Sequence, residues 1–291
     1  MKRLRVITVW TWLAMAAVLS SCGTLSRSPA GGIRLAPDSV IPVQDPCAVA
    51  SDSAAIGALR RELIASGEAG SAPILALSGG GANGAYGAGV LVGWTQTGER
   101  PVFKIVTGVS TGALTAPFAF LGARWDPQLQ AAYANGEAKD ILGWRQLATF
   151  ALPSLYSASA LKRLVDRAVS PAMLQEIAVE HGKGRRLLVA TTNLDTQETV
   201  IWDMGVIAKQ GGPQALTLFK DVLVASASIP GVFPPVLIAG RAKDGRIVQE
   251  MHVDGGVNLS FLAVPESLLL WKDPNPHPTR GVIHVLVNGQ I

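Results

Sequence analysis

The sequence predicts a layered α/β domain that follows a distinct N-terminal segment. Three observations favour this fold class. The 291-residue chain is 48% hydrophobic and only 16% charged, which excludes a disordered protein, because disorder requires low hydrophobicity and high net charge. From Ala72 onward, short apolar runs alternate with helix-like stretches, as in strands and helices that pack in layers. No run of 18 or more apolar residues follows the first twenty positions, which excludes a protein with several membrane spans.

The expected elements follow one another as an α/β domain requires. Short apolar runs predict strands at residues 74–78, 102–107, 187–190, 199–202, 247–253 and 282–287. Helical spacing predicts helices at residues 84–95 and 112–122 and over most of residues 125–180. No internal repeat is visible, so residues 72–291 are interpreted as one domain.

The first 21 residues have the pattern of a secretory signal peptide. Three basic residues within the first five positions precede an apolar run at residues 6–19, and small residues follow. The Leu-Ser-Ser-Cys sequence that ends at Cys22 resembles the bacterial lipoprotein signal. This resemblance implies that Cys22 is diacylated and anchors the chain in the cell envelope, and Gly23 favours the outer membrane. An ordinary signal peptide, in which Cys22 is incidental, is the alternative.

Removal of residues 1–21 takes away three basic residues and lowers the formal net charge from +4 to +1. No basic stripe remains to pair with phosphates, so nucleic-acid binding is not expected. Residues 22–71 are rich in Ser, Ala, Gly and Pro, and they predict a lipidated tether with a short helix at residues 53–66. Within this tether we expect Cys47 to be a passive free thiol, with an intermolecular disulfide as the alternative.

A glycine-rich turn, SGGGANG, lies between the first expected strand and the first expected helix. Its residues 79–84 fit the G-x-G-x-x-G pattern of a dinucleotide site. That site requires an acidic residue at the end of the next strand, whereas Glu99 precedes its strand. The second interpretation is an oxyanion hole, because the backbone N–H groups of Gly79, Gly80 and Gly81 can approach a developing negative charge with no Cβ in the way. A plain tight turn is the third.

The pattern G-x-S-x-G at residues 108–112 makes Ser110 a candidate nucleophile. It lies between an expected strand and an expected helix, and the small residues Gly108 and Gly112 allow the sharp turn that exposes a serine Oγ. A helix N-terminus also favours negative charge at this position. The glycine-rich turn upstream would supply the oxyanion site that such a serine needs.

A nucleophilic serine needs a group that removes its proton. Asp254 is the better candidate, because it ends an expected strand and is followed by Gly255 and Gly256, which leave its carboxylate free to meet another loop. A simple Asp-Gly turn is the alternative. None of the four histidines has the surroundings of a catalytic loop, and His252 could be a modulator or a packed strand residue. The four are His181, His252, His277 and His284.

In this order, the motifs GGGANG, GVSTG and DGG resemble the patatin-like phospholipase family. Residues 225–235 (ASASIPGVFPP) and 287–289 (VNG) are similar to further blocks of that family, and the resemblance covers about residues 73–289. It implies a three-layer α/β/α domain with a mainly parallel central sheet. It also implies a serine acyl-ester hydrolase (EC 3.1.1) that acts on lipid or ester substrates through an acyl-enzyme, without metal or organic cofactor.

Carried over by position, the resemblance makes Ser110 the nucleophile, Asp254 its activating partner and Gly79 to Gly81 the oxyanion hole, with Gly84 as part of the glycine motif. Asn83 is a departure, because many relatives carry Arg or Lys there, and this leaves both phospholipids and simpler esters open as substrates. The apolar stretch at residues 147–155 is expected to line an acyl pocket, touch a bilayer or pack in the core. A catalytically inert lipoprotein scaffold and a nucleotide-binding module are the alternative functions.

Overall fold

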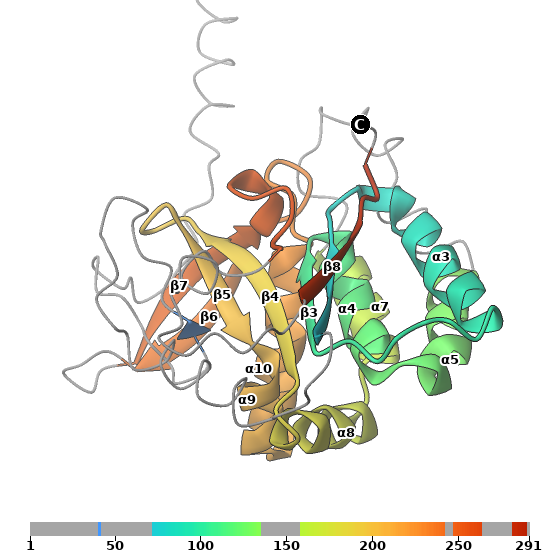
Figure 1. The fold of residues 1–291 in the computed structure, drawn as a ribbon. Helices are drawn as coiled ribbons and strands as arrows, with labels where there is room; N and C mark the ends of the chain where they lie inside the picture. The colour runs from blue at the N-terminus through green and yellow to red at the C-terminus, as the bar shows by residue number, and fades with distance from the viewer. Residues whose placement is uncertain (1–39, 42–71, 135–157, 242–246, 264–280, 290–291) are drawn as a thin grey trace, which may run out of the picture.

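The computed structural model describes residues 40–41, 72–134, 158–241, 247–263 and 281–289. Over these ranges an eight-stranded sheet forms the centre of the domain, with helices packed against it (Figure 1). The predicted α/β class, a mainly parallel central sheet with flanking helices, is confirmed. No helix in the described ranges is long and apolar enough to cross a membrane. The expected features at Cys22, Cys47, His277 and residues 53–66 and 147–155 lie outside these ranges.

Four parallel strands form the centre of the sheet, in the order β8-β2-β3-β4. Their bounds are β2 (Ala72–Leu77), β3 (Ile105–Val109), β4 (Arg186–Asn193) and β8 (Gly281–Leu286). Four further strands extend the sheet by antiparallel pairing beyond β4. These are β1 (Val40–Ile41), β5 (Glu198–Asp203), β6 (Val236–Arg241) and β7 (Ile247–Asp254).

Strand β4 pairs with two strands that lie end to end along one of its sides. Strand β3 follows β4 as far as the pair Val109 and Ala190, and β7 begins at the next residue with the pair Thr191 and Asp254. Strand β5 pairs with the same stretch of β4 and must therefore occupy the other side, because a strand has only two hydrogen-bonding sides. The C-terminal ends of β3 and β7 therefore meet at neighbouring positions of β4.

Within the described ranges, seven helices connect and cover these strands (Figure 1). They are α3 (Gly84–Gln96), α4 (Thr111–Leu121), α5 (Asp126–Ala134), α7 (Ala158–Ala168), α8 (Pro171–Gly182), α9 (Met204–Gln210) and α10 (Gly212–Ser226), with short 3-10 turns η1 (Gly81–Asn83), η2 (Ala123–Trp125) and η4 (Gly255–Val257). The helices expected at residues 84–95 and 112–122 correspond to α3 and α4. The strand expected from residue 102 begins only at Ile105, since Val102 is 74% exposed. Helices α9 and α10 and strand β6 were not predicted.

The core forms two clusters because successive strand side chains point to opposite faces of the sheet. In β4, Leu187 and Val189 belong to the larger cluster, whereas Leu188 and Ala190 belong to the smaller one. Each of the seven helices contributes to the larger cluster, with Phe118 of α4 and Phe219 of α10 among its fully buried members. Burial of each such side chain stabilises the fold by roughly 1.5–3 kcal/mol, so this face fixes α4 and α10 against the sheet.

Candidate active site

Ser110 forms a sharp turn between β3 and α4. Its φ of 56° and ψ of −127° are a conformation that a non-glycine residue adopts only at a cost. The flanking glycines make the turn possible: a Cβ on Gly108 would lie 2.6 Å from Ala113 Cα, and one on Gly112 would lie 2.4 Å from the Leu77 carbonyl oxygen. The structure thus contains a strand–turn–helix elbow around Ser110, as the G-x-S-x-G pattern predicts.

The structure brings Ser110 and Asp254 together across 144 positions of the sequence. The Ser110 hydroxyl donates to Asp254 Oδ2 over 2.6 Å, and both side chains are buried. The end-to-end arrangement of β3 and β7 produces this contact, because it places the last residues of both strands beside one another. Gly255 permits the close approach, since a Cβ there would lie 2.5 Å from the Ala190 carbonyl oxygen.

Burial has the largest influence on the pKa of Asp254, and no cation of the described residues offsets it. Burial raises the pKa of its carboxyl to about 6, although hydrogen bonds from the Ser110 hydroxyl and the Gly256 N–H act in the opposite direction. The Gly256 bond reaches Oδ1 over 2.6 Å, so each carboxylate oxygen has one donor. The raised pKa makes this carboxylate a stronger base than an ordinary aspartate while leaving it ionised at neutral pH.

The glycine-rich turn lies directly against the elbow. A Cβ on Gly79 would be 3.1 Å from Ser110 Cβ, so a larger residue here would press on the serine. The Gly79 N–H donates to the Ser260 carbonyl over a long 3.4 Å. Within the part of the chain that the structure describes, the N–H groups of Gly80 and Gly81 make no hydrogen bond. These two donors are therefore free to bind an oxyanion.

Asn288, just after β8, holds the glycine-rich turn in place. Its backbone N–H donates to Ser78 Oγ and its side-chain amide donates to the Ser78 carbonyl, both over 2.8 Å. A Cβ on Gly80 would lie 2.6 Å from the Asn288 backbone, so the two segments are in direct contact. The sequence marked residues 287–289 only as a family block. The signal for a structural role was present, because neighbouring parallel strands end at the same edge of a sheet.

Gly84 and Asn83 complete the motif. A Cβ on Gly84 would lie only 2.0 Å from Thr111 Oγ1, so this glycine lets the start of α3 contact the start of α4. Asn83 is exposed and makes no side-chain capping bond to α3. The glycine motif therefore carries a neutral, solvent-facing side chain at residue 83.

None of the three described histidines is bonded to Ser110. His252 is fully buried, with Nδ1 3.0 Å from Thr191 Oγ1 and Nε2 3.4 Å from a carboxylate oxygen of Glu250. Thr191 Oγ1 also accepts from the Trp202 indole over 2.8 Å, so His252 belongs to a buried polar cluster and not to the dyad. His181 lies beside Asp203, and His284 packs edge-on against the Trp94 ring.

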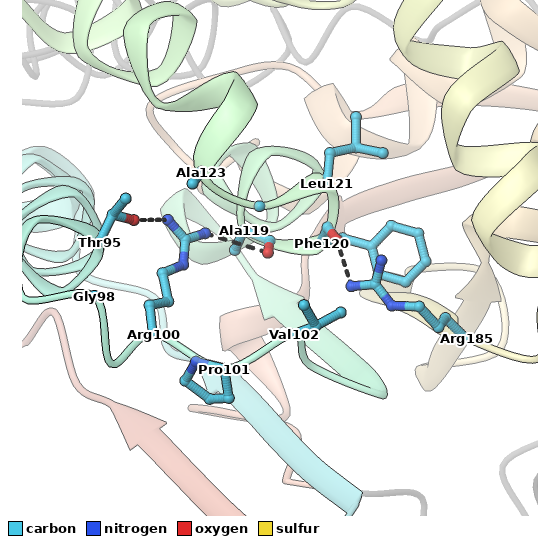
Figure 2. Close-up of a pocket in the computed structure, with 11 residues that line it drawn as sticks. Thr95, Gly98, Arg100, Pro101, Val102, Ala119, Phe120, Leu121, Ala123 and Arg185 are labelled. Carbon is cyan, nitrogen blue, oxygen red and sulfur yellow. Dashed lines mark hydrogen bonds between the residues drawn. The ribbon is translucent and has the colours of Figure 1, made fainter. Parts of the chain in front are cut away.

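A cavity of about 260 Å³ lies beside the N-terminal ends of β3 and β4, whereas the Ser110 elbow follows the C-terminal end of β3 (Figure 2). We refer to these two sides as the opposite edge and the carboxyl edge of the parallel strands. Two arginines line it. Arg100 bonds Thr95, Asp126 and the Ala119 carbonyl, while Arg185 bonds Glu180 and stacks on the Phe120 ring, 4.3 Å from its centroid. Both guanidinium groups are thus committed to the ends of helices and to carboxylates, which indicates a structural site. In the described ranges, no group of three or more His, Cys, Asp or Glu residues could hold a metal ion.

The fold and the elbow define an α/β protein with a buried serine at the carboxyl edge of its parallel strands. Residues 75–265 match the patatin-like phospholipase family, which is more than half of the chain, and the protein therefore belongs to that family. This membership supports a lipid acyl hydrolase activity.

Among solved structures, the chain is similar to VipD from Legionella pneumophila, with 16% identity and a TM-score of 0.34. The similarity covers 73% of this chain and 49% of VipD, so the chain spans about half the length of that protein. No curated protein matches the chain.

Proposed function

We propose that the protein is a serine acyl-ester hydrolase of the phospholipase or lysophospholipase type, with Ser110 and Asp254 as its catalytic dyad. The observation that carries this proposal is the 2.6 Å hydrogen bond from the Ser110 hydroxyl to a buried carboxylate. A serine needs only a positioned base and an oxyanion site to act as a nucleophile. Family membership supplies the substrate class, a lipid acyl ester.

In the proposed reaction, Asp254 takes the hydroxyl proton as Ser110 Oγ attacks the ester carbonyl carbon. The carbonyl oxygen becomes an oxyanion, which accepts hydrogen bonds from the free N–H groups of Gly80 and Gly81 and lies near the N-terminus of α4. The protonated Asp254 then gives its proton to the leaving alcohol, and an acyl-enzyme on Ser110 remains. Asp254 then takes a proton from water as the water oxygen attacks the acyl carbon. The bond from that carbon to Ser110 Oγ breaks, the acid leaves, and Asp254 returns the proton to Oγ.

Labelling with a fluorophosphonate tests the nucleophile and the base. The mature chain should react covalently, and both Ser110→Ala and Asp254→Asn should abolish the reaction. Retained labelling of Ser110→Ala would overturn the assignment of the nucleophile. Loss of labelling in Ser110→Ala but not in Asp254→Asn would overturn the assignment of the base. A folded wild-type protein that neither labels nor hydrolyses esters would favour the inert scaffold instead.

The exposed, neutral Asn83 bears on the choice of lipid. A cation at this position would attract a phosphate by simple electrostatics, and its absence favours simple uncharged esters over phosphate-bearing lipids. Comparison of wild type with Asn83→Arg on both substrate types tests this proposal. The variant should gain activity on phospholipid relative to a short-chain ester. An unchanged ratio would remove Asn83 from the account of specificity.

We also propose that lipidated Cys22 anchors the enzyme in the bacterial outer membrane. The sequence pattern at residues 1–22 supports this proposal. Metabolic labelling with palmitate should mark the wild-type chain and leave Cys22→Ser unlabelled. Release of the wild-type chain as a soluble, unlabelled protein would contradict the anchor without affecting the proposed chemistry.

A further inference from the structure

We infer that Ser226, at the C-terminal end of α10, is a positioning residue that holds the Ser110 elbow in its strained conformation and in register with Asp254. This inference rests on the proposed function, since it concerns the geometry of the same dyad. Ser226 belongs to the block ASASIPGVFPP, whose role was not predicted from the sequence.

The Ser226 hydroxyl connects three segments at the point where β3 and β7 meet. Its oxygen accepts the backbone N–H of Ser110 over 3.1 Å, and its proton goes to the Ala190 carbonyl over 2.7 Å. The side chain is fully buried. Ala190 is also the residue of β4 where pairing with β3 ends. Ser226 therefore links the elbow to the strand that aligns both members of the dyad.

The next turn of the same segment holds the other half of the dyad. The Asp254 backbone N–H donates to the Ser228 carbonyl over 2.9 Å. Ser226 at the end of α10 and Ser228 just after it thus accept hydrogen bonds from the backbone N–H groups of Ser110 and Asp254, respectively. The larger core cluster holds α10 in place. These two contacts therefore hold Ser110 and Asp254 at fixed positions relative to α10.

The energetic reason lies in the Ser110 N–H. Without Ser226 Oγ this buried donor would have no partner, and an unpaired buried N–H is costly. Ser110 has a positive φ, a costly conformation that persists only where surrounding contacts hold it, and loss of this bond removes one of those contacts. Relaxation of the elbow would move Oγ away from Asp254 Oδ2 and lengthen the hydrogen bond on which proton transfer depends.

Ser228 offers a matched control. It is buried like Ser226, but its hydroxyl bonds the Val224 carbonyl in the last turn of α10, over 2.7 Å. Its contact with Asp254 uses the backbone carbonyl and survives substitution of the side chain. Ser226→Ala and Ser228→Ala therefore remove the same group from equally buried positions, and only the first touches the elbow.

The test measures fluorophosphonate labelling rates and ester hydrolysis for the wild type and both variants. Ser226→Ala should lower the labelling rate and kcat by about tenfold or more, the scale set by one lost buried hydrogen bond, with KM nearly unchanged. Ser228→Ala should stay within about twofold of wild type, with a similar loss in Tm. Equal rates for the two variants would overturn the inference, while a wild type that does not label would overturn the proposed function instead.

A second measurement distinguishes a positioning role of Ser226 from a general loss of rigidity in the protein. The pH–rate profile of Ser226→Ala should shift to a higher midpoint, because the Ser110 hydrogen bond normally lowers the pKa of Asp254 and would be weakened. If Ser226→Ala does not fold, Ser226→Thr and Ser226→Val replace it, since these two side chains share a shape and differ in the hydroxyl. The Thr variant should label at least ten times faster than the Val variant, on the same free-energy scale, and equal rates would refute the role.

Discussion

The two edges of the parallel strands both bury charged side chains, but they compensate the charge differently. At the carboxyl edge, the donors to the Asp254 carboxylate within the described residues are the Ser110 hydroxyl and the Gly256 N–H. At the opposite edge, Arg100 pairs with Asp126 over 2.8 Å and Arg185 pairs with Glu180 over 2.9 Å. Among the described residues, the Asp254 carboxylate is therefore buried without a counter-ion, whereas Arg100 and Arg185 each have one.

This difference indicates that the unpaired carboxylate serves catalysis, whereas the paired arginines serve stability. A lone buried carboxylate is poorly solvated, which raises its affinity for a proton and suits it to act as a base. A buried guanidinium that is paired and bonded to helix carbonyls closes the ends of α3 and α4 and satisfies groups that would otherwise lack partners. We therefore expect changes at the first edge to alter activity and changes at the second to alter stability.

The largest effect is expected for Asp254→Asn. Loss of the base should reduce kcat for ester hydrolysis by on the order of 10³–10⁴-fold, the range typical of a general base and its supporting carboxylate. The protein should remain folded by circular dichroism, because Asn keeps the shape of the side chain. A smaller loss than tenfold would place the base elsewhere and break the contrast between the edges.

At the other edge, Asp126→Asn should act on stability. It leaves the Arg100 guanidinium, whose side chain is only 4% exposed, without its counter-ion, and breaking a buried pair in this way costs about 3–5 kcal/mol. Urea unfolding measures this loss. Turnover per folded molecule should equal that of the wild type, and a specific fall in kcat would show that the two edges are coupled.

The pH dependence of stability sharpens the comparison. Because the pKa of Asp254 rises from 3.8 to about 6 on folding, its ionisation destabilises the folded state by about 3 kcal/mol, fully present above pH 6 and absent below about pH 4. Asp254→Asn lacks this penalty. The variant should therefore gain stability over wild type as pH rises from 4 to 6 in urea titrations, and a constant difference would contradict the raised pKa.

The smallest effect is expected where a charge lies at the surface. Lys183 pairs with Glu180 over 2.7 Å, but its side chain is 63% exposed. Lys183→Ala should change the free energy of unfolding by less than about 0.5 kcal/mol, as is usual for exposed pairs. It serves as the baseline for Asp126→Asn in the same urea experiment, and a loss of comparable size in both would erase the distinction between buried and exposed pairs.

The sequence revealed the parts of the site that local chemistry encodes. Ser110 and the glycine-rich turn follow strands and open helices, so turn chemistry alone marks them. Asn288 and Ser226 escaped assignment because their roles arise from contacts with residues more than one hundred positions away. Arg100 and Arg185 escaped for a different reason, since charged side chains are usually placed at the surface.

The secondary structure shows the same limit. The strand at residues 74–78 and the helix at residues 84–95 have clear punctuation by glycine and were predicted closely. Strand β6, in contrast, was not predicted although it begins with the short apolar run VLIA, and it is held by its long ladder with β7. The expected start of β3 at residue 102 was wrong by three residues because Val102, although apolar, remains in water.

The place where β3 and β7 meet beside β4 determines how precisely these strands must pair. Only three residue pairs join β4 to β7, and a slip of one residue would shift Asp254 by about 3.3 Å and turn its side chain to the opposite face. Apolar pairs would tolerate such a slip, whereas the bond from Asn193 to Glu250 over 2.9 Å and the contact of Thr191 with His252 exist in one alignment only. The buried polar side chains thus fix the alignment of β7 on β4. Refolding should restore ester hydrolysis only when β7 has paired with β4 in this alignment.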